Sequence, residues 1–199
     1  MRQHVISAAI VCVGAVALWH ATDGARAITT EGARRVQVIT AAPVVSAVSL
    51  TDHTGGTIAV TAPIGGVALV EFVYTTCPTI CVSAGILFSQ LRDRLAVEGL
   101  APRVHMYSVS FDPRRDRPDA LAAYADAHGI DGGIWKIGTP GAAALPRILS
   151  DFGVTVIPDG FDGYEHNAAI HIVNSDNRLI GILDIDNIPA VVNAVRRLK

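Results

Sequence analysis

The chain has 199 residues, half of them apolar and 17% charged, which fits one domain with an ordinary packed core plus a tail. The formal net charge of −2 excludes the strongly basic surface that nucleic-acid binding requires. Three cysteines are present. Cys12 lies in an N-terminal apolar run, so a single pair, Cys77 and Cys81, remains for the domain. One close pair is not a disulfide scaffold, and a redox or metal-binding role is favoured.

The N-terminus has the pattern of an export segment. Arg2 and His4 precede the uncharged apolar run Val5–Trp19, and residues 25–27 (ARA) form a small-x-small cleavage candidate. The run is shorter than the ~20 residues of a membrane span, so residues 1–27 are either a signal peptide or an N-terminal membrane anchor. Either way, we expect an exported protein in the bacterial periplasm or on the periplasmic face of the inner membrane.

Residues 28–45 are small and mixed-polar and are expected to form a linker, which leaves residues 46–199 as the folded domain. The apolar and β-branched patterns predict strands and helices in a definite order. The predicted strands are Ser46–Leu50, Thr57–Val60, Val67–Tyr74, Val104–Phe111, Ile134–Ile137, Ala168–Val173 and Leu179–Leu183. The predicted helices are Val82–Val97, Pro118–His128, Ala142–Phe152 and Ile188–Leu198. A hairpin, β-α-β-α, and a terminal β-β-α predict an α/β, thioredoxin-like fold, with a mixed sheet flanked by helices.

The cysteines stand at the point where the first central strand passes into a helix. Cys77 and Cys81 are four residues apart and therefore share one helical face. Pro78 suits a first helical turn, where the helix dipole favours a thiolate. The pair can bind a soft metal ion or close as a disulfide. Three intervening residues distinguish it from the Cys-x-x-Cys redox motif, and a structural disulfide remains a third alternative.

Two thiolates suit copper(I) or zinc, and a closed site requires further ligands, for which histidine is the natural choice. His166 is a candidate, because it follows a glycine-containing stretch and directly precedes the strand expected beside the cysteine-bearing one. His128 is expected to cap a helix as a cation next to Gly129. His171 alternates with apolar neighbours and is expected to point away from their face.

Three segments resemble the motifs of the Sco/SenC copper-binding proteins. They are residues 74–81 (YTTCPTIC), residues 108–118 (SVSFDPRRDRP) and residues 164–170 (YEHNAAI). The order and approximate spacing match, and the resemblance covers about residues 46–198. It departs from the family pattern at Thr79, Val82 and Glu165, none of which is a ligand position.

The resemblance implies a thioredoxin fold with an N-terminal hairpin and a copper site formed by Cys77, Cys81 and His166. Copper(I) or copper(II) would bind there, and Cys77–Cys81 would be a disulfide in the oxidised form. It also implies a chaperone that delivers copper to, or reduces the thiols of, the dinuclear copper site of cytochrome c oxidase. The partner would be the copper-binding oxidase subunit or another copper chaperone, with membrane attachment through the N-terminal segment.

Three acids leave alternatives open. Glu71 lies inside a buried strand, six residues before Cys77, where thioredoxins carry a buried acid that assists thiol–disulfide exchange. It either pairs with an arginine or reaches the sheet end, or it accepts a proton from the thiols. Asp112 and Asp116 lie at the carboxyl end of a central strand, where sites of α/β folds tend to form, and either could belong to the site. The alternative is a local role, in which Asp112 shapes the Asp-Pro turn and Asp116 helps cap the helix from Pro118. The alternative function is a thiol-disulfide oxidoreductase, although thioredoxin-type catalysts place a cis-proline where this chain has residues 165–167.

Overall fold

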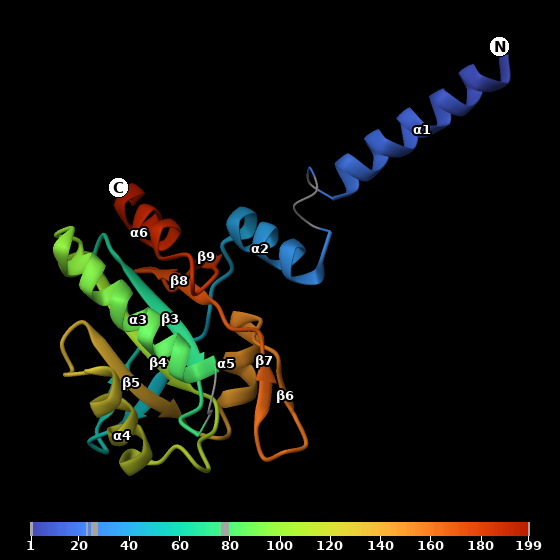
Figure 1. Cartoon of the computed structure of the whole chain (residues 1–199). Coiled ribbons are helices and arrows are strands. Elements are labelled where there is room, and N and C mark those ends of the chain that lie inside the picture. The colour runs from blue at the N-terminus through green and yellow to red at the C-terminus, as the bar shows by residue number, and fades with distance from the viewer. Residues whose placement is uncertain (1, 23, 25–27, 77–79, 199) are drawn as a thin grey trace. The chain divides into compact units, whose positions relative to one another are not determined.

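The computed structural model describes residues 2–22, 24, 28–76 and 80–198. The chain divides into two compact units, Met1–Ala42 and Pro43–Lys199. The first unit contains helices α1 (Arg2–Ala21) and α2 (Thr30–Ala41) (Figure 1). Among the helices of the described residues, none combines the length and the apolar character needed to cross a membrane.

Helix α2 lies in the segment that the sequence analysis expected to be a linker. Its start has local support, since the Thr29 side chain accepts a hydrogen bond from Gly32 N at 3.0 Å. Glu31 in the first turn forms ion pairs with Arg34 and Arg35. Capping and charge pairing thus favour a helix where the composition alone indicated a tether.

The second unit is built on a seven-stranded sheet with the order β2-β1-β5-β4-β3-β8-β9. Strands β3, β4 and β5 are parallel neighbours, whereas β8 and β9 on one side and β1 and β2 on the other run antiparallel to their neighbours. The strands are β1 (Ser49–Asp52), β2 (Thr57–Ala59), β3 (Val67–Val73), β4 (Val104–Ser110), β5 (Trp135–Pro140), β8 (Ile170–Asn174) and β9 (Leu179–Leu183). This mixed sheet confirms the predicted thioredoxin-like fold.

Helices α3 (Ile80–Val97) and α4 (Pro118–His128) join the parallel strands, as parallel pairing requires. α5 (Leu145–Phe152) follows β5, α6 (Ile188–Arg197) follows β9, and a 3₁₀ turn spans Ala101–Arg103. α3, α4 and α6 supply side chains to one buried cluster with β3, β4, β5 and β8. On the other face, Phe152 of α5 packs edge-on against Phe72 of β3, with ring centroids 5.3 Å apart. Both faces of β3 are therefore covered, and all its residues are buried.

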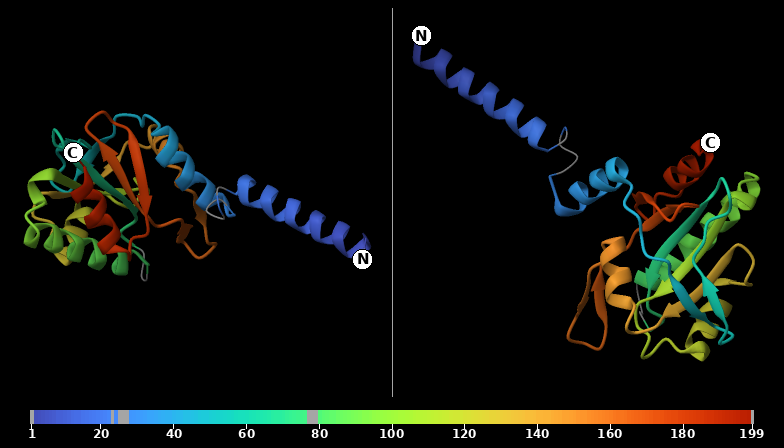
Figure 2. Two further views of the ribbon diagram at one scale, coloured as in Figure 1. Left: turned by 90° about the horizontal axis from the view of Figure 1, so that it is seen from above. Right: turned by 180° about the vertical axis from the view of Figure 1, so that it is seen from behind.

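The structure differs from the sequence prediction before β8. A separate two-stranded sheet, here called the ribbon, is formed by β6 (Val156–Pro158) and β7 (Tyr164–His166). Figure 2 shows the ribbon beside the main sheet. Asp159 closes its turn by accepting hydrogen bonds from Phe161 N and Gly163 N. His166 is thus on a strand, opposite Val156, and not in the loop that the glycine content suggested.

Candidate functional site

The cysteine segment leaves the carboxyl end of β3, the position at which sites of parallel α/β sheets tend to form. Tyr74, Thr75 and Thr76 follow the strand, and α3 begins at Ile80. Cys77 lies outside the described residues. Only the backbone of Cys81 is described, in the first turn of α3. The passage from strand to helix is as predicted, while the ligand roles of both cysteines stay predictions.

His166 lies on the ribbon and is half-buried. Both ring nitrogens are buried and have no hydrogen-bond partner among the described residues. The ring packs against Phe111 with centroids 5.0 Å apart. Burial lowers the pKa of His166 below its ordinary value of 6.5. A buried polar ring without partners is costly, and a neutral imidazole with a free lone pair is what a metal ligand requires. The His166 side chain therefore fits a metal-binding role.

Aromatic side chains connect His166 to the strand that leads into the cysteine segment. The Tyr74 hydroxyl donates to the Tyr164 carbonyl at 3.4 Å and accepts from Tyr164 N at 3.3 Å. The Tyr164 ring also packs edge-on against Tyr74 and Phe111, with centroids 5.3 and 5.6 Å apart. β7 is thereby attached to the carboxyl ends of β3 and β4. β8, which follows β7, pairs with β3 as expected.

Asp112 shapes the turn after β4, as predicted, since its carbonyl accepts from Arg115 N and Asp116 N. The prediction for Asp116 was wrong. The N-cap residue of α4 is Arg117, and its side chain forms no capping hydrogen bond. The Asp116 carboxylate is fully buried and bonds to other groups. It accepts hydrogen bonds from Ser110 and from the backbone and side chain of Thr75. Thr75 is 41 residues away from Asp116, and Ser110 six residues before it on β4, so a helix-capping pattern could not reveal either partner.

Glu71 is buried and forms no ion pair with an arginine of the described residues, contrary to part of one alternative. Its Oε1 accepts a hydrogen bond from Ser108 Oγ at 2.5 Å, and Ser108 Oγ accepts one from Trp135 Nε1 at 2.9 Å. Within the described residues, Oε2 has no partner. Burial raises the pKa of Glu71 to about 8, against a smaller lowering by the Ser108 hydrogen bond. The group can therefore exchange a proton near neutral pH.

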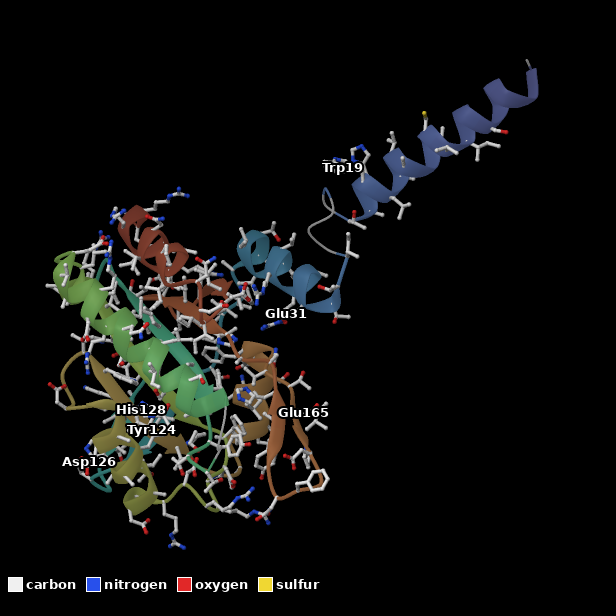
Figure 3. All side chains as sticks on the ribbon, viewed as in Figure 1. Trp19, Glu31, Tyr124, Asp126, His128 and Glu165 are labelled. Atoms are coloured by element: carbon white, nitrogen blue, oxygen red, sulfur yellow. The ribbon has the colours of Figure 1, made fainter. Side chains whose placement is uncertain are left out.

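Two further histidines, His171 and His128, have structural surroundings. His171 is fully buried between the rings of Phe72 and Phe152. His128 lies in the last turn of α4 next to the Gly129 cap, as predicted, and its ring packs at a tilt against Tyr124 (Figure 3). Burial lowers the pKa of His128, which disfavours the cationic form that the predicted cap uses. Among the described residues, no three His, Cys, Asp or Glu side chains are grouped as a metal site.

The sheet order, the cysteines at the passage from β3 to α3, and His166 packed on Phe111 at the end of β4 define a thioredoxin-like protein with candidate metal ligands. The profile of the SCO1/SenC family matches residues 36–198. The chain belongs to the SCO1/SenC family.

Individual relatives agree with this assignment. The SCO1 protein homolog of Bacillus subtilis (strain 168) is 27% identical over 119 residues, which are 58% of this chain and 61% of that protein. The match thus spans about three fifths of the relative's length. Among solved structures, a SCO1/SenC family lipoprotein from Bacillus anthracis str. Ames has a TM-score of 0.69 and 19% identity, over 78% of this chain and 94% of that one.

Two further structures share the fold. BsSco, a member of the Sco family of cytochrome c oxidase assembly proteins in which a disulfide switch was identified, has a TM-score of 0.65 and 20% identity. That similarity covers 77% of this chain and 91% of BsSco. Bradyrhizobium japonicum ScoI, with copper bound, has a TM-score of 0.60 and 19% identity, over 77% and 99% of the two chains.

Proposed function

We propose that this protein binds copper through Cys77, Cys81 and His166. The observation that carries the proposal is His166, whose two buried ring nitrogens have no hydrogen-bond partner among the described residues and whose ring packs on Phe111 next to the end of β4. Membership of the SCO1/SenC family supports it, as does the copper found in the similarly folded ScoI. Two thiolates and one imidazole form a donor set suited to copper.

Copper in this proposal is cargo. The thiolates bind copper(I), and His166 completes the set for copper(II). Transfer proceeds by exchange of these ligands for those of a receiving protein. The proposed receiver is the copper-binding subunit of cytochrome c oxidase, or another copper chaperone. Family membership and the oxidase-assembly role of BsSco support this choice. The proposed location is the periplasm or the periplasmic face of the inner membrane, which the export pattern and the lipoprotein relative support.

Glu71 favours thiol–disulfide exchange as a second function. One cysteine thiolate would attack a partner disulfide to form a mixed disulfide, and the other would then attack the first sulfur. The partner disulfide would gain two electrons and leave as a dithiol, while Cys77 and Cys81 would become a disulfide. Glu71, with a pKa near 8, would accept a thiol proton. The same chemistry would prepare the thiols of a copper site for metal.

Copper titration of the reduced full chain tests the main proposal. Cys12 is exposed, so Cys12→Ser serves as the background and leaves two thiols. Copper is titrated as copper(I) and copper(II) against chromophoric chelators for the parent, His166→Ala and His105→Ala. His105 is the matched control, because it is the second residue of β4, at the end of the strand opposite His166, and contacts the Thr61 carbonyl.

We expect the parent and His105→Ala to compete equally, and His166→Ala to lose copper(II) affinity most. A parent that fails to compete, or a His166→Ala variant that binds both ions as tightly as the parent, contradicts the three-ligand site. Rapid reduction of a disulfide substrate that is lost in Glu71→Gln would instead support the second function.

A further inference from the structure

The turn after β4 contacts both halves of the candidate copper site. Four side chains, from Ser110 at the end of β4 and from Asp112, Arg115 and Asp116 in the turn, are called the clamp here. One arm of the clamp reaches the residues that lead to Cys77, and the other reaches the ribbon that carries His166. The inference drawn from them rests on the proposed copper-binding function.

The first arm is the buried carboxylate of Asp116. Its Oδ2 accepts from Thr75 N at 3.0 Å and from Ser110 Oγ at 2.5 Å, and its Oδ1 accepts from Thr75 Oγ1 at 2.6 Å. Thr75 stands two residues before Cys77. Because both donors of Thr75 are bound by one carboxylate, the start of the cysteine segment is fixed relative to β4.

The second arm is the guanidinium of the adjacent Arg115. It forms an ion pair with Asp112, donates to the Asp162 carbonyl at 2.5 Å, and lies 3.0 Å from Asp162 Oδ1. It also lies over the Tyr164 ring, 5.3 Å from the centroid. Asp162 and Tyr164 stand four and two residues before His166. The ribbon is a separate sheet, so side-chain contacts of this kind determine where His166 lies.

We propose that Asp116 and Arg115 are positioning residues that together set the separation between the cysteine pair and His166. Asp116 holds the segment that leads to Cys77, and the adjacent Arg115 holds the ribbon that carries His166. Both segments are therefore positioned by the same turn. The arms have different consequences for the metal. Copper(I) is satisfied by few soft ligands, whereas copper(II) prefers a fuller, more defined set. The Arg115 arm therefore matters most for copper(II).

Three substitutions test the clamp in the Cys12→Ser full chain. Arg115→Met removes the guanidinium but keeps an unbranched side chain, with the neighbouring exposed Arg114→Met as its matched control. Thr75→Val removes the Oγ1 donor with little change of shape, and Thr75→Ser restores it. The measurements are copper(I) and copper(II) affinities and the thiolate-to-copper(II) charge-transfer absorption.

We expect Arg115→Met to lower copper(II) affinity 10- to 100-fold, the range typical of groups that orient a metal ligand, and to shift the absorption band. Its copper(I) affinity should change less than about threefold. Thr75→Val should lower the affinity for both copper(I) and copper(II). Thr75→Ser and Arg114→Met should bind both ions as the parent does. In a His166→Ala background, Arg115→Met should add no further copper(II) loss, since its arm acts through His166.

Parent-like copper(II) affinity and absorption in both Arg115→Met and Thr75→Val would overturn the clamp while leaving copper binding intact. A further loss from Arg115→Met in the His166→Ala background would also overturn it, because that result indicates general destabilisation. A parent that binds no copper overturns the proposed function and the clamp together. Arg115 and Thr75 are partly exposed, and thermal unfolding of each variant checks that the fold survives.

Discussion

Two buried acids near the carboxyl end of the central strands have opposite surroundings. Both oxygens of Asp116 accept hydrogen bonds, three in all, from Thr75 and Ser110. Glu71 has a hydrogen bond at only one oxygen, from Ser108, and its other oxygen has no partner among the described residues. His166 resembles Glu71, since its ring nitrogens also lack described partners. A buried polar group with all its hydrogen bonds made holds the structure in place. A buried polar group with an unbonded atom can still bind a proton or a metal ion.

The largest expected effect concerns Glu71. Its pKa is about 8 when folded against an ordinary value of 4.5, so the folded chain binds the extra proton between these values. The stabilisation is complete below about pH 4.5 and is lost as the pH rises through about 8. We expect the free energy of unfolding to fall by on the order of 4 kcal/mol across this window, relative to Glu71→Gln.

Urea denaturation of the full chain from pH 4 to 9 measures this difference. The exposed Asp126 (Figure 3) provides a control, since Asp126→Asn should keep the pH dependence of the parent. A difference between the parent and Glu71→Gln that does not change with pH would show that the buried carboxyl does not titrate in this range.

Asp116→Ala should have the next largest effect. The substitution leaves the donors of Thr75 and Ser110 without their acceptor, and we expect a loss of about 3 kcal/mol of unfolding free energy. Asp119→Ala removes an exposed acid three residues along the chain and should cost less than about 0.5 kcal/mol. Equal stabilities for the two variants, measured in urea at pH 7, would contradict an anchoring role for Asp116.

The smallest expected effect has the opposite sign. In His166→Leu, an apolar side chain replaces an imidazole whose buried nitrogens have no hydrogen-bond partner among the described residues, and it can still pack against Phe111. We expect the free energy of unfolding of the metal-free protein to rise by about 1 kcal/mol. Copper at 100 times its dissociation constant should stabilise the parent by about 2.7 kcal/mol and the variant far less. Thermal unfolding with and without copper measures both. A less stable metal-free variant would mean that His166 is a structural residue.

Local pattern predicted the elements whose boundaries are local. The predicted helix Pro118–His128 matches α4 at both ends, because proline starts it and Gly129, with φ of 67°, ends it. The strands of the ribbon are three residues long and pair with each other, so neither shows a strand period of its own. The first hairpin strand runs from Ser49 to Asp52, whereas the predicted strand was Ser46–Leu50.

The site was predictable to a different degree for each residue. His166 emerged as one candidate among several from its position before β8, and the family resemblance then favoured it. The Asp116–Thr75 contact joins residues 41 positions apart, and the aspartate just before a helix indicated a cap instead. The environment of Glu71 depends on Ser108, its register partner on β4, and on Trp135 of β5. Such pairings follow from sheet order, which no single segment encodes.

The hydrogen bond from Trp135 to Ser108 gives the protein an optical probe of its own chemistry. The chain has two tryptophans, and the other, Trp19, lies exposed on α1 (Figure 3). In a Trp19→Phe chain, all indole fluorescence comes from the buried Trp135 ring. Its N–H donates a hydrogen bond to the Ser108 hydroxyl, which in turn donates one to Glu71. Protonation of Glu71 alters the electric field at that indole, so emission recorded during a pH titration reads the charge of the carboxyl without an added label.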